Sequence, residues 1–371
     1  MTNITRKVVL FPHPGKEHKA SKNQIECGNK LIMPWNCSEH KRKFLLSEGS
    51  YVDSNGNLHQ DEMIAFWGEW EQPSEFIELN KSIRNTNSPC FIHTPICPEN
   101  EVTRYLKTNN KIDPAFIQKY VQNNSFYNGK QNTDPYVFGD RFYYSCCKQS
   151  ISMMKNLDPG DVVIFYSTTG KGVLKAYVDT VFVIGGRIEI NGQREYSYGN
   201  IDNLNELMSK CTLQYFTGAI LPIVFGNKGS LPKKTQNTIK NVLYYGATVN
   251  NPIYVNGEKM YSFFPCKRIT SKDMQCLSNY QGFERPLVFE RTLISGIISN
   301  HSKKYETILN EIRCKDSLPN TGVVGKDVLN GNSLTDVYTY WKNLKNYFLE
   351  SGYLIGVKAL EPNIQLYKCM K

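Results

Sequence analysis

Two apolar runs between residues 157 and 186 constrain the fold of this chain more than any other feature. The first covers residues 161–168 and follows the turn Leu157-Asp158-Pro159-Gly160-Asp161; the second covers residues 175–186. Val, Ile, Phe and Tyr dominate both runs and favour strands, while Pro and Gly favour a turn before the first. We predict two neighbouring strands, the second ending at Gly185-Gly186, then a third short strand over residues 187–196. This order predicts a small, closed β-barrel-like module.

The remaining sequence mixes helix and strand patterns. Residues 217–226 form another apolar run that predicts a strand, and Asn256-Gly257 predicts a hairpin turn. Residues 334–350 predict a helix, because apolar side chains recur there at helical spacing, namely Val337, Tyr340, Trp341, Leu344, Tyr347 and Phe348. We therefore expect an α+β fold with mixed sheets and a helical C-terminal part. A β-rich domain over residues 1–200 and an α+β domain over residues 201–371 are expected, although no linker marks their boundary.

Composition and the N-terminus exclude several classes of protein. Hydrophobic residues make up 40% and charged residues 21% of the chain, which excludes wholesale disorder. The apolar run of residues 8–11 stops at Pro12, too short for a secretory signal. No stretch approaches the roughly 20 apolar residues of a membrane span. We expect a cytoplasmic protein without a membrane partner.

The cysteines favour reduced thiols. There are 11 of them, an odd number in a chain of this length, and no CxxC pair occurs. Cys90, His93 and Cys97 form the nearest approach to a metal site, but their spacing differs from that of standard zinc motifs. We predict no metal, with a zinc ion at these three residues as the alternative.

Charge is distributed unevenly along the chain. The formal net charge is +10; residues 1–50 carry nine Lys/Arg and four Asp/Glu (+5), and residues 51–100 carry two and eight (−6). Five of the six histidines also lie in the first hundred residues. Such a concentration of titratable side chains indicates a site or an interface. The net charge permits a polyanionic partner without requiring one.

The segment from Phe138 to Gly186 resembles the PUA-like superfamily, especially its EVE and ASCH branches. The resemblance depends on the Leu157–Tyr166 turn and strand and on the run Val178–Ile184. It implies a central β-barrel module in which Gly160 makes the turn and Asp161 binds backbone amides. EVE members and the related YTH members read modified bases with an aromatic cage. The resemblance covers about fifty residues.

Further polar and aromatic signatures resemble uncharacterised bacterial proteins associated with nucleotide modification and phage defence. These signatures are His13–His18, Trp35-Asn36, His40–Phe44, Phe66–Glu71 and Asn132–Gly139. The resemblance implies a role in bacterial defence or nucleic-acid processing. It supplies no established chemistry.

Three sets of residues are candidates for a site. Two imidazoles near carboxylates favour proton transfer, and this catalytic set is His13, Glu17, His18, Glu69 and Glu71. Cations favour phosphate contacts, and this set is His40, Lys41, Arg42, Lys43 and Arg141. Aromatic and amide side chains suit a base, and this set is Trp35, Asn36, Trp67, Asn132, Asp134, Tyr136 and Phe142. Each set has an ordinary alternative: a polar loop, a solvated basic face, and a packed core with turns.

Motifs of the common nucleotide enzymes are missing from the sequence. It has no Walker A, no GxGxxG after a strand, no GxSxG and no HExxH. Our leading hypothesis is therefore a protein that binds nucleic acid or a nucleotide, as a reader of modified bases. The alternatives are an enzyme that acts on nucleotides or bases through the His/Glu set, and a non-catalytic subunit of a larger complex. The sequence assigns no cofactor.

Overall fold

The structure of the chain is a computed structural model. It describes residues 5–19, 24–34, 41–99, 101–109, 111–113, 115–116, 133–145, 152–169, 173–191, 201–221, 240–292, 326–327 and 333–365. Helices and strands are mixed, as expected for an α+β fold. Among the helices of these residues, none is both long and apolar enough to cross a membrane.

The first sheet contains seven of the described strands. Their order is β17-β1-β10-β11-β12-β9, and β16 also pairs with β11. Their bounds are β17 Lys326–Asp327, β1 Val8–Pro14, β10 Val162–Thr169, β11 Val173–Asn191, β12 Lys240–Gly246, β9 Tyr143–Tyr144 and β16 Leu287–Thr292. β1 runs parallel to β10, whereas β10 and β11 are antiparallel. The two apolar runs of the sequence therefore pair at the centre of this sheet.

The second sheet contains eight described strands in the order β18-β15-β5-β4-β7-β6-β3-β2. Their bounds are β18 Leu354–Ala359, β15 Phe264–Arg268, β5 Leu58–Gly68, β4 Lys43–Val52, β7 Phe91–Pro95, β6 Ser74–Glu78, β3 Lys30–Met33 and β2 Ile25–Cys27. β18 also pairs with β4, so β4, β5, β15 and β18 close an antiparallel four-stranded ring. Two further strand pairs are β13 (Ile253–Val255) with β14 (Glu258–Met260), and β8 (Cys97–Pro98) with β19 (Ile364–Gln365).

Helices connect and cover the sheets. The described ones are α1 Glu101–Thr108, α3 Ser152–Lys155, α4 Ile201–Lys210, α5 Leu213–Tyr215, the π-helix Phe216–Ile220, α7 Ser271–Gln275, the 3-10 helix Leu277–Asn279 and α9 Leu334–Glu350. A capping box of Ser333 and Asp336 starts α9. The predicted C-terminal helix is thus confirmed, with five of its six predicted apolar positions buried and Tyr347 partly buried.

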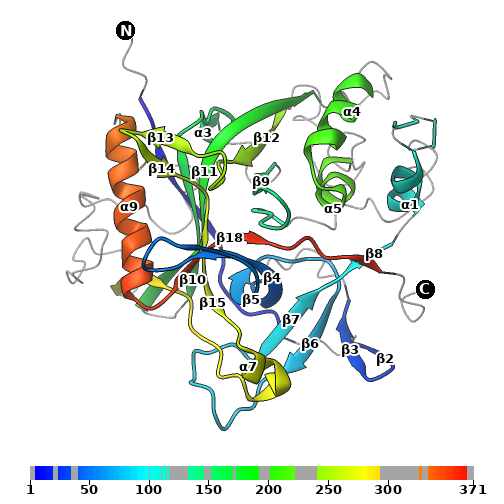
Figure 1. Cartoon of the computed structure of the whole chain (residues 1–371), viewed down its shortest axis with the longest axis vertical. Helices are drawn as coiled ribbons and strands as arrows, with labels where there is room; N and C mark the ends of the chain where they lie inside the picture. Colours follow the sequence, from blue (N-terminus) through cyan, green and yellow to red (C-terminus); the bar gives the residue numbers. More distant parts are fainter. Residues whose placement is uncertain are drawn as a thin grey trace.

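Apolar side chains on both faces of β1 and β10 are buried. Val9 and Phe165 point into a core between the two sheets, where they join Phe66 of β5. Leu10 and Ile164 point to the opposite face, which α9 covers (Figure 1). Burial on both faces explains why these strands are continuous apolar runs without polar alternation.

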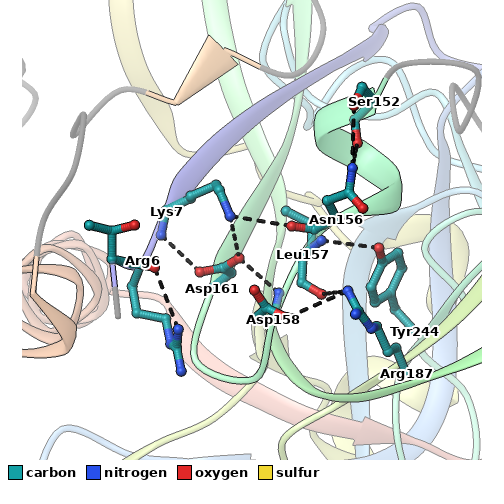
Figure 2. Close-up of polar contacts among 10 residues, drawn as sticks. Arg6, Lys7, Ser152, Asn156, Leu157, Asp158, Asp161, Arg187 and Tyr244 are labelled. Carbon is teal, nitrogen blue, oxygen red and sulfur yellow. Dashed lines mark hydrogen bonds and ion pairs between the residues drawn. The ribbon is translucent and has the colours of Figure 1, made fainter. Parts of the chain in front are cut away.

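The turn before β10 folds as its sequence predicts (Figure 2). Gly160 has a positive φ of 92°. The buried Asp161 carboxylate accepts hydrogen bonds from the backbone N–H groups of Lys7 and Asp158, both at 2.9 Å. Burial raises the pKa of Asp161, although these two backbone hydrogen bonds oppose the rise. Asp161 therefore joins the start of β1 to the start of β10.

Replacing Asp161 by alanine should lower the free energy of unfolding by roughly 2–3 kcal/mol, because two backbone N–H groups lose a charged acceptor. Asp158 in the same turn is the matched control. Its side chain is 44% exposed and lies 3.5 Å from Arg187, so Asp158→Ala should cost less than about 1 kcal/mol. Urea titrations of both variants measure the two costs. Equal costs would contradict the role of Asp161.

Two secondary-structure expectations differ from the structure. Gly185 and Gly186 do not end a strand: β11 continues to Asn191, with a register shift between Ile184 and Gly186. An ideal Cβ on Gly185 would lie 2.7 Å from the Ala247 nitrogen, so close packing explains this glycine. Residues 217–221 are helical, because an apolar run alone does not separate a buried helix from a strand.

The boundary expected at residue 200 does not separate the sheets. β12 and β16 follow it in sequence but pair with β11. Likewise β15 and β18 belong to the ring with β4 and β5. Each sheet therefore needs strands from both sides of residue 200.

Candidate functional site

A pocket of about 610 Å³ lies where both sheets contribute side chains. Segment 15–19, just after β1, forms one wall, and segment 86–90, before β7, forms another. Four cationic side chains line it: Lys16, Lys19, Lys41 and Arg285. Two aromatic side chains, Trp67 and Tyr177, and two carboxylates, Glu17 and Glu284, complete its charged and aromatic lining.

Backbone pairing holds segment 15–19 in place. The His18 N–H donates to the Arg42 carbonyl at 2.8 Å, and the Arg42 N–H donates to the Lys16 carbonyl at 2.9 Å. The Glu17 Oε1 atom accepts from the backbone N–H groups of Cys90 (2.7 Å) and Phe91 (3.0 Å). Burial raises the pKa of Glu17, and these hydrogen bonds oppose the rise. Glu17 therefore ties the two walls of the pocket together.

Arg285 forms part of the pocket between the two aromatic rings. Its guanidinium carbon lies 5.3 Å from the ring centroid of Trp67 and 4.9 Å from that of Tyr177, which is cation–π range. The Trp67 side chain is itself buried, and its indole N–H donates to the Phe283 carbonyl at 2.9 Å. A base could stack on Trp67 only if Arg285 moved; in this conformation the indole supports the arginine.

Arg42 lies inside the protein, although it was predicted to contact phosphate. Arg42 is 0% exposed. Its Nε donates to Asp179 Oδ2 at 2.9 Å and its Nη1 donates to Glu69 Oε2 at 3.0 Å. Burial alone would lower the pKa of Arg42, but the charges of Asp179 and Glu69 outweigh it and raise the pKa. Arg42 is thus an internal ion-pair centre that joins the two sheets.

Lys43 is the second buried cation of the predicted basic stretch, and it too is 0% exposed. Its Nζ donates to the Gln72 carbonyl (3.2 Å) and to Ser74 Oγ (3.1 Å). Burial lowers the pKa of Lys43 to about 7, opposed by the charge of Glu71. Neither Arg42 nor Lys43 offers a surface to a phosphate in this conformation. The ordinary alternative for this stretch, a solvated basic face, does not describe Arg42 and Lys43 either, because sheet packing encloses both side chains.

The catalytic set does not gather in the pocket. Among its described side chains, Glu17 alone lines the cavity. His18 is 6% exposed, and Glu69 and Glu71 are buried. His13 lies in β1 opposite Ser167 of β10, but its side chain is outside the described part of the structure. The convergence that an enzyme of this set requires is not present in the described side chains.

Two aromatic residues of the base-binding set, Tyr136 and Phe142, pack in the core. Tyr136 is 0% and Phe142 is 2% exposed. The Tyr136 hydroxyl donates to Glu361 Oε1 at 3.3 Å, and the Ser145 N–H donates to the buried Asp134 carboxylate at 3.3 Å. No described residue of segment 133–145 lines the pocket. These three side chains therefore have no exposed surface for a base.

The remaining candidates divide into two groups. Arg141 is partly buried, with its guanidinium carbon 5.3 Å from the ring centroid of Tyr245. Lys41 is partly buried and lines the pocket, so its predicted phosphate contact stays a prediction. The others lie outside the described residues: Trp35, Asn36, His40 and Asn132.

The residues of the zinc alternative have other contacts. The Cys90 thiol lies 2.7 Å from Arg84 Nη1, and His93 Nδ1 lies 3.1 Å from Ser74 Oγ. Burial raises the pKa of Cys97 to about 12. No group of three or more metal-ligating side chains occurs in the described part of the chain. Cys90, Cys97, Cys211, Cys266 and Cys276 are free thiols, as expected, whereas Cys27 forms a disulfide, so the expectation of reduced thiols does not hold at Cys27.

Sequence reasoning missed three central residues: Tyr177, Asp179 and Arg285. Asp179 could have been found from the sequence, since it is a carboxylate inside an apolar strand and so requires a buried partner. Tyr177 and Arg285 could not, because a tyrosine in a strand and an arginine before one are ordinary. No family model, no curated protein and no solved structure matches this chain.

Proposed function

We propose that this chain binds nucleic acid or a nucleotide, and that it reads modified or unusual bases. The observation that carries the proposal is the pocket, which four cations and two aromatic side chains line together, with Arg285 in cation–π range of both rings. Lys and Arg are the side chains that contact phosphates, and a pocket of about 610 Å³ has the size of a small-molecule site. A role in bacterial defence or nucleic-acid processing belongs to the same proposal.

The proposal includes a PUA-like barrel module at the centre of the chain. Supporting it, the Leu157–Asp161 turn leads into β10, which lies between the parallel β1 and the antiparallel β11. The pocket adjoins this unit, because segment 15–19 directly follows β1 and Tyr177 belongs to β11. A module of this kind would present the end of β1 to the ligand.

The alternatives have less support. The enzyme hypothesis needs its His and Glu side chains in one cavity, and among those described Glu17 alone is there. The subunit hypothesis needs an exposed apolar patch. Exposed large apolar side chains come from separate elements, such as Leu58 in β5, Tyr254 in β13 and Met274 in α7.

Replacing Lys16 and Lys19 together by glutamate should weaken oligonucleotide binding, because both exposed lysines border the pocket. Each lost phosphate contact should flatten the slope of log K against log salt by about 0.7 for single strands. Fluorescence anisotropy with plain and modified single-stranded DNA and RNA, over a range of salt concentrations, measures both effects.

Lys272→Glu is the matched control, since Lys272 is an exposed lysine of α7 that does not line the pocket. It should leave the slope unchanged. Absence of binding by the wild-type protein to every oligonucleotide at low salt would contradict the proposed function.

A further inference from the structure

Arg285 is a largely enclosed cation of the pocket. Its side chain is 9% exposed, whereas Lys16 and Lys19 are exposed residues at the rim. It lies 118 residues from Ser167 and 270 residues from Gly15 in sequence, yet contacts both. The fold therefore brings a largely enclosed guanidinium into a pocket that three lysines and two glutamates also line.

Fixed contacts hold this guanidinium. The Nη2 group donates to the Gly15 carbonyl at 2.6 Å, and the Nη1 group donates to Ser167 Oγ. Nη1 also lies 3.7 Å from Asp179 Oδ1. These contacts use at most three of the five N–H donors of an arginine. The remaining donors suit an oxyanion, which arginine binds with two parallel hydrogen bonds.

The counter-charge of Arg285 is shared with a second arginine. Asp179 Oδ2 accepts a hydrogen bond from Arg42 Nε at 2.9 Å. The other carboxylate oxygen, Oδ1, lies farther from Arg285 Nη1, at 3.7 Å. Burial lowers the pKa of Arg285; Asp179 opposes this effect, and the positive charge of Arg42 adds to it. Arg42 also pairs with Glu69 at 3.0 Å, whereas Asp179 lies 3.7 Å from Arg285, so a negative group in the pocket could approach Arg285 more closely than Asp179 does.

We propose that Arg285 binds the phosphate of the ligand, and that Asp179 and Arg42 are positioning residues that orient its guanidinium. This rests on the proposed function and adds to it the part of the ligand that enters the pocket. The phosphate belongs either to a free nucleotide or to a nucleic-acid chain. The lysines at the rim then contact further phosphates or remain as a general positive field.

Calorimetric titration tests this with paired probes: the four nucleoside 5′-monophosphates, the matching nucleosides, inorganic phosphate, and one oligonucleotide with and without a 5′-phosphate. The wild-type protein should bind the monophosphates at least about tenfold more tightly than the nucleosides. Arg285→Lys keeps the charge but loses the planar donor pair. The Arg285→Lys variant should lose most of the difference in affinity between monophosphates and nucleosides, and its affinity for nucleosides should be unchanged. Inorganic phosphate should bind the wild type more tightly than the variant.

Asp179→Asn should reduce the same difference in affinity between monophosphate and nucleoside. A merely structural role of Asp179 would leave this difference in affinity unchanged. Arg268→Gln, which removes a half-exposed arginine outside the pocket lining, should retain the difference. If Asp179→Asn does not fold, Ser167→Ala tests positioning through the other anchor of Nη1 and should also reduce the difference. A folded positioning variant with an unchanged difference would overturn the positioning role.

Each outcome has one meaning. If the wild type binds the monophosphate more tightly than the oligonucleotide, and Arg285→Lys weakens that binding, the phosphate contact is supported and its source is a free nucleotide. If the wild type binds the oligonucleotide more tightly, and Arg285→Lys weakens that binding, the source is a nucleic-acid chain. Oligonucleotide binding that is identical in wild type and Arg285→Lys overturns the role of Arg285 while the proposed function stands. Failure of every nucleoside, nucleotide and oligonucleotide to bind the wild type overturns both.

Discussion

Replacing Arg42 by methionine should lower the free energy of unfolding by about 3–5 kcal/mol, because it leaves two buried carboxylates without their shared cation. Arg42, Glu69 and Asp179 all have side chains that are at most 2% exposed. The chain offers a closely matched comparison: Arg268 Nε lies 2.9 Å from Glu62 Oε2, the same distance as Arg42 Nε from Asp179. The Arg268 side chain is 53% exposed, so Arg268→Met should cost less than about 1 kcal/mol.

Guanidinium chloride titrations of the two methionine variants measure this contrast. The double variant Arg42→Met/Glu69→Gln should recover part of the loss, because it removes one of the carboxylates that the single change leaves behind. Asp179 keeps its contact with Arg285 in that variant. Similar costs for Arg42→Met and Arg268→Met would show that the internal ion pairs are not enclosed in solution.

Replacing Lys43 by methionine should remove a pH dependence of stability. The ordinary lysine pKa is 10.5, and burial lowers that of Lys43 to about 7, against the opposing charge of Glu71. Between these two values the unfolded chain holds a proton that the folded chain lacks, so Lys43 makes the free energy of unfolding rise with pH. Over the whole range between the two pKa values, Lys43 changes the free energy of unfolding by about 5 kcal/mol. Between pH 7 and pH 9 the change is about 2 kcal/mol.

Urea midpoints of wild type and variant at pH 7, 8 and 9 measure this effect as a difference. Other groups also titrate in this window, but they are common to both proteins and cancel. Lys272→Met, at an exposed position of α7, should keep the wild-type pH dependence. A Lys43→Met variant whose stability follows the wild type in parallel over this range would show that Lys43 is not deprotonated inside the fold.

Local sequence patterns predicted much of the fold. The turn at Gly160 and Asp161, the hairpin turn at Asn256-Gly257 and helix α9 all form where short-range rules place them. Side chains of β5 face alternate sides, as in any strand: Phe66 joins the core between the sheets and Trp67 joins a different cluster. These features depend on residues that are close in sequence, so turn chemistry and periodicity are enough to find them.

The candidate site was harder to predict, because long-range pairing decides it. Arg42 is buried by a partner 137 residues away, and Arg285 by contacts 118 and 270 residues away. A run of adjacent cations indicates a solvated surface unless the tertiary partners are known. The sequence did identify Glu17, Lys41 and Trp67, which line the pocket. It did not distinguish residues that face the cavity from residues that support its walls.

The four-stranded ring has a consequence for synthesis of the chain on the ribosome. β4 and β5 are translated early, whereas β18, which pairs with β4 over residues 49–52, is made some three hundred residues later. In the interval that stretch of β4 lacks its final neighbour, and an unpaired strand edge is a template for association with other chains. The nascent protein therefore passes through a long period in which its second sheet is incomplete and vulnerable to misassembly.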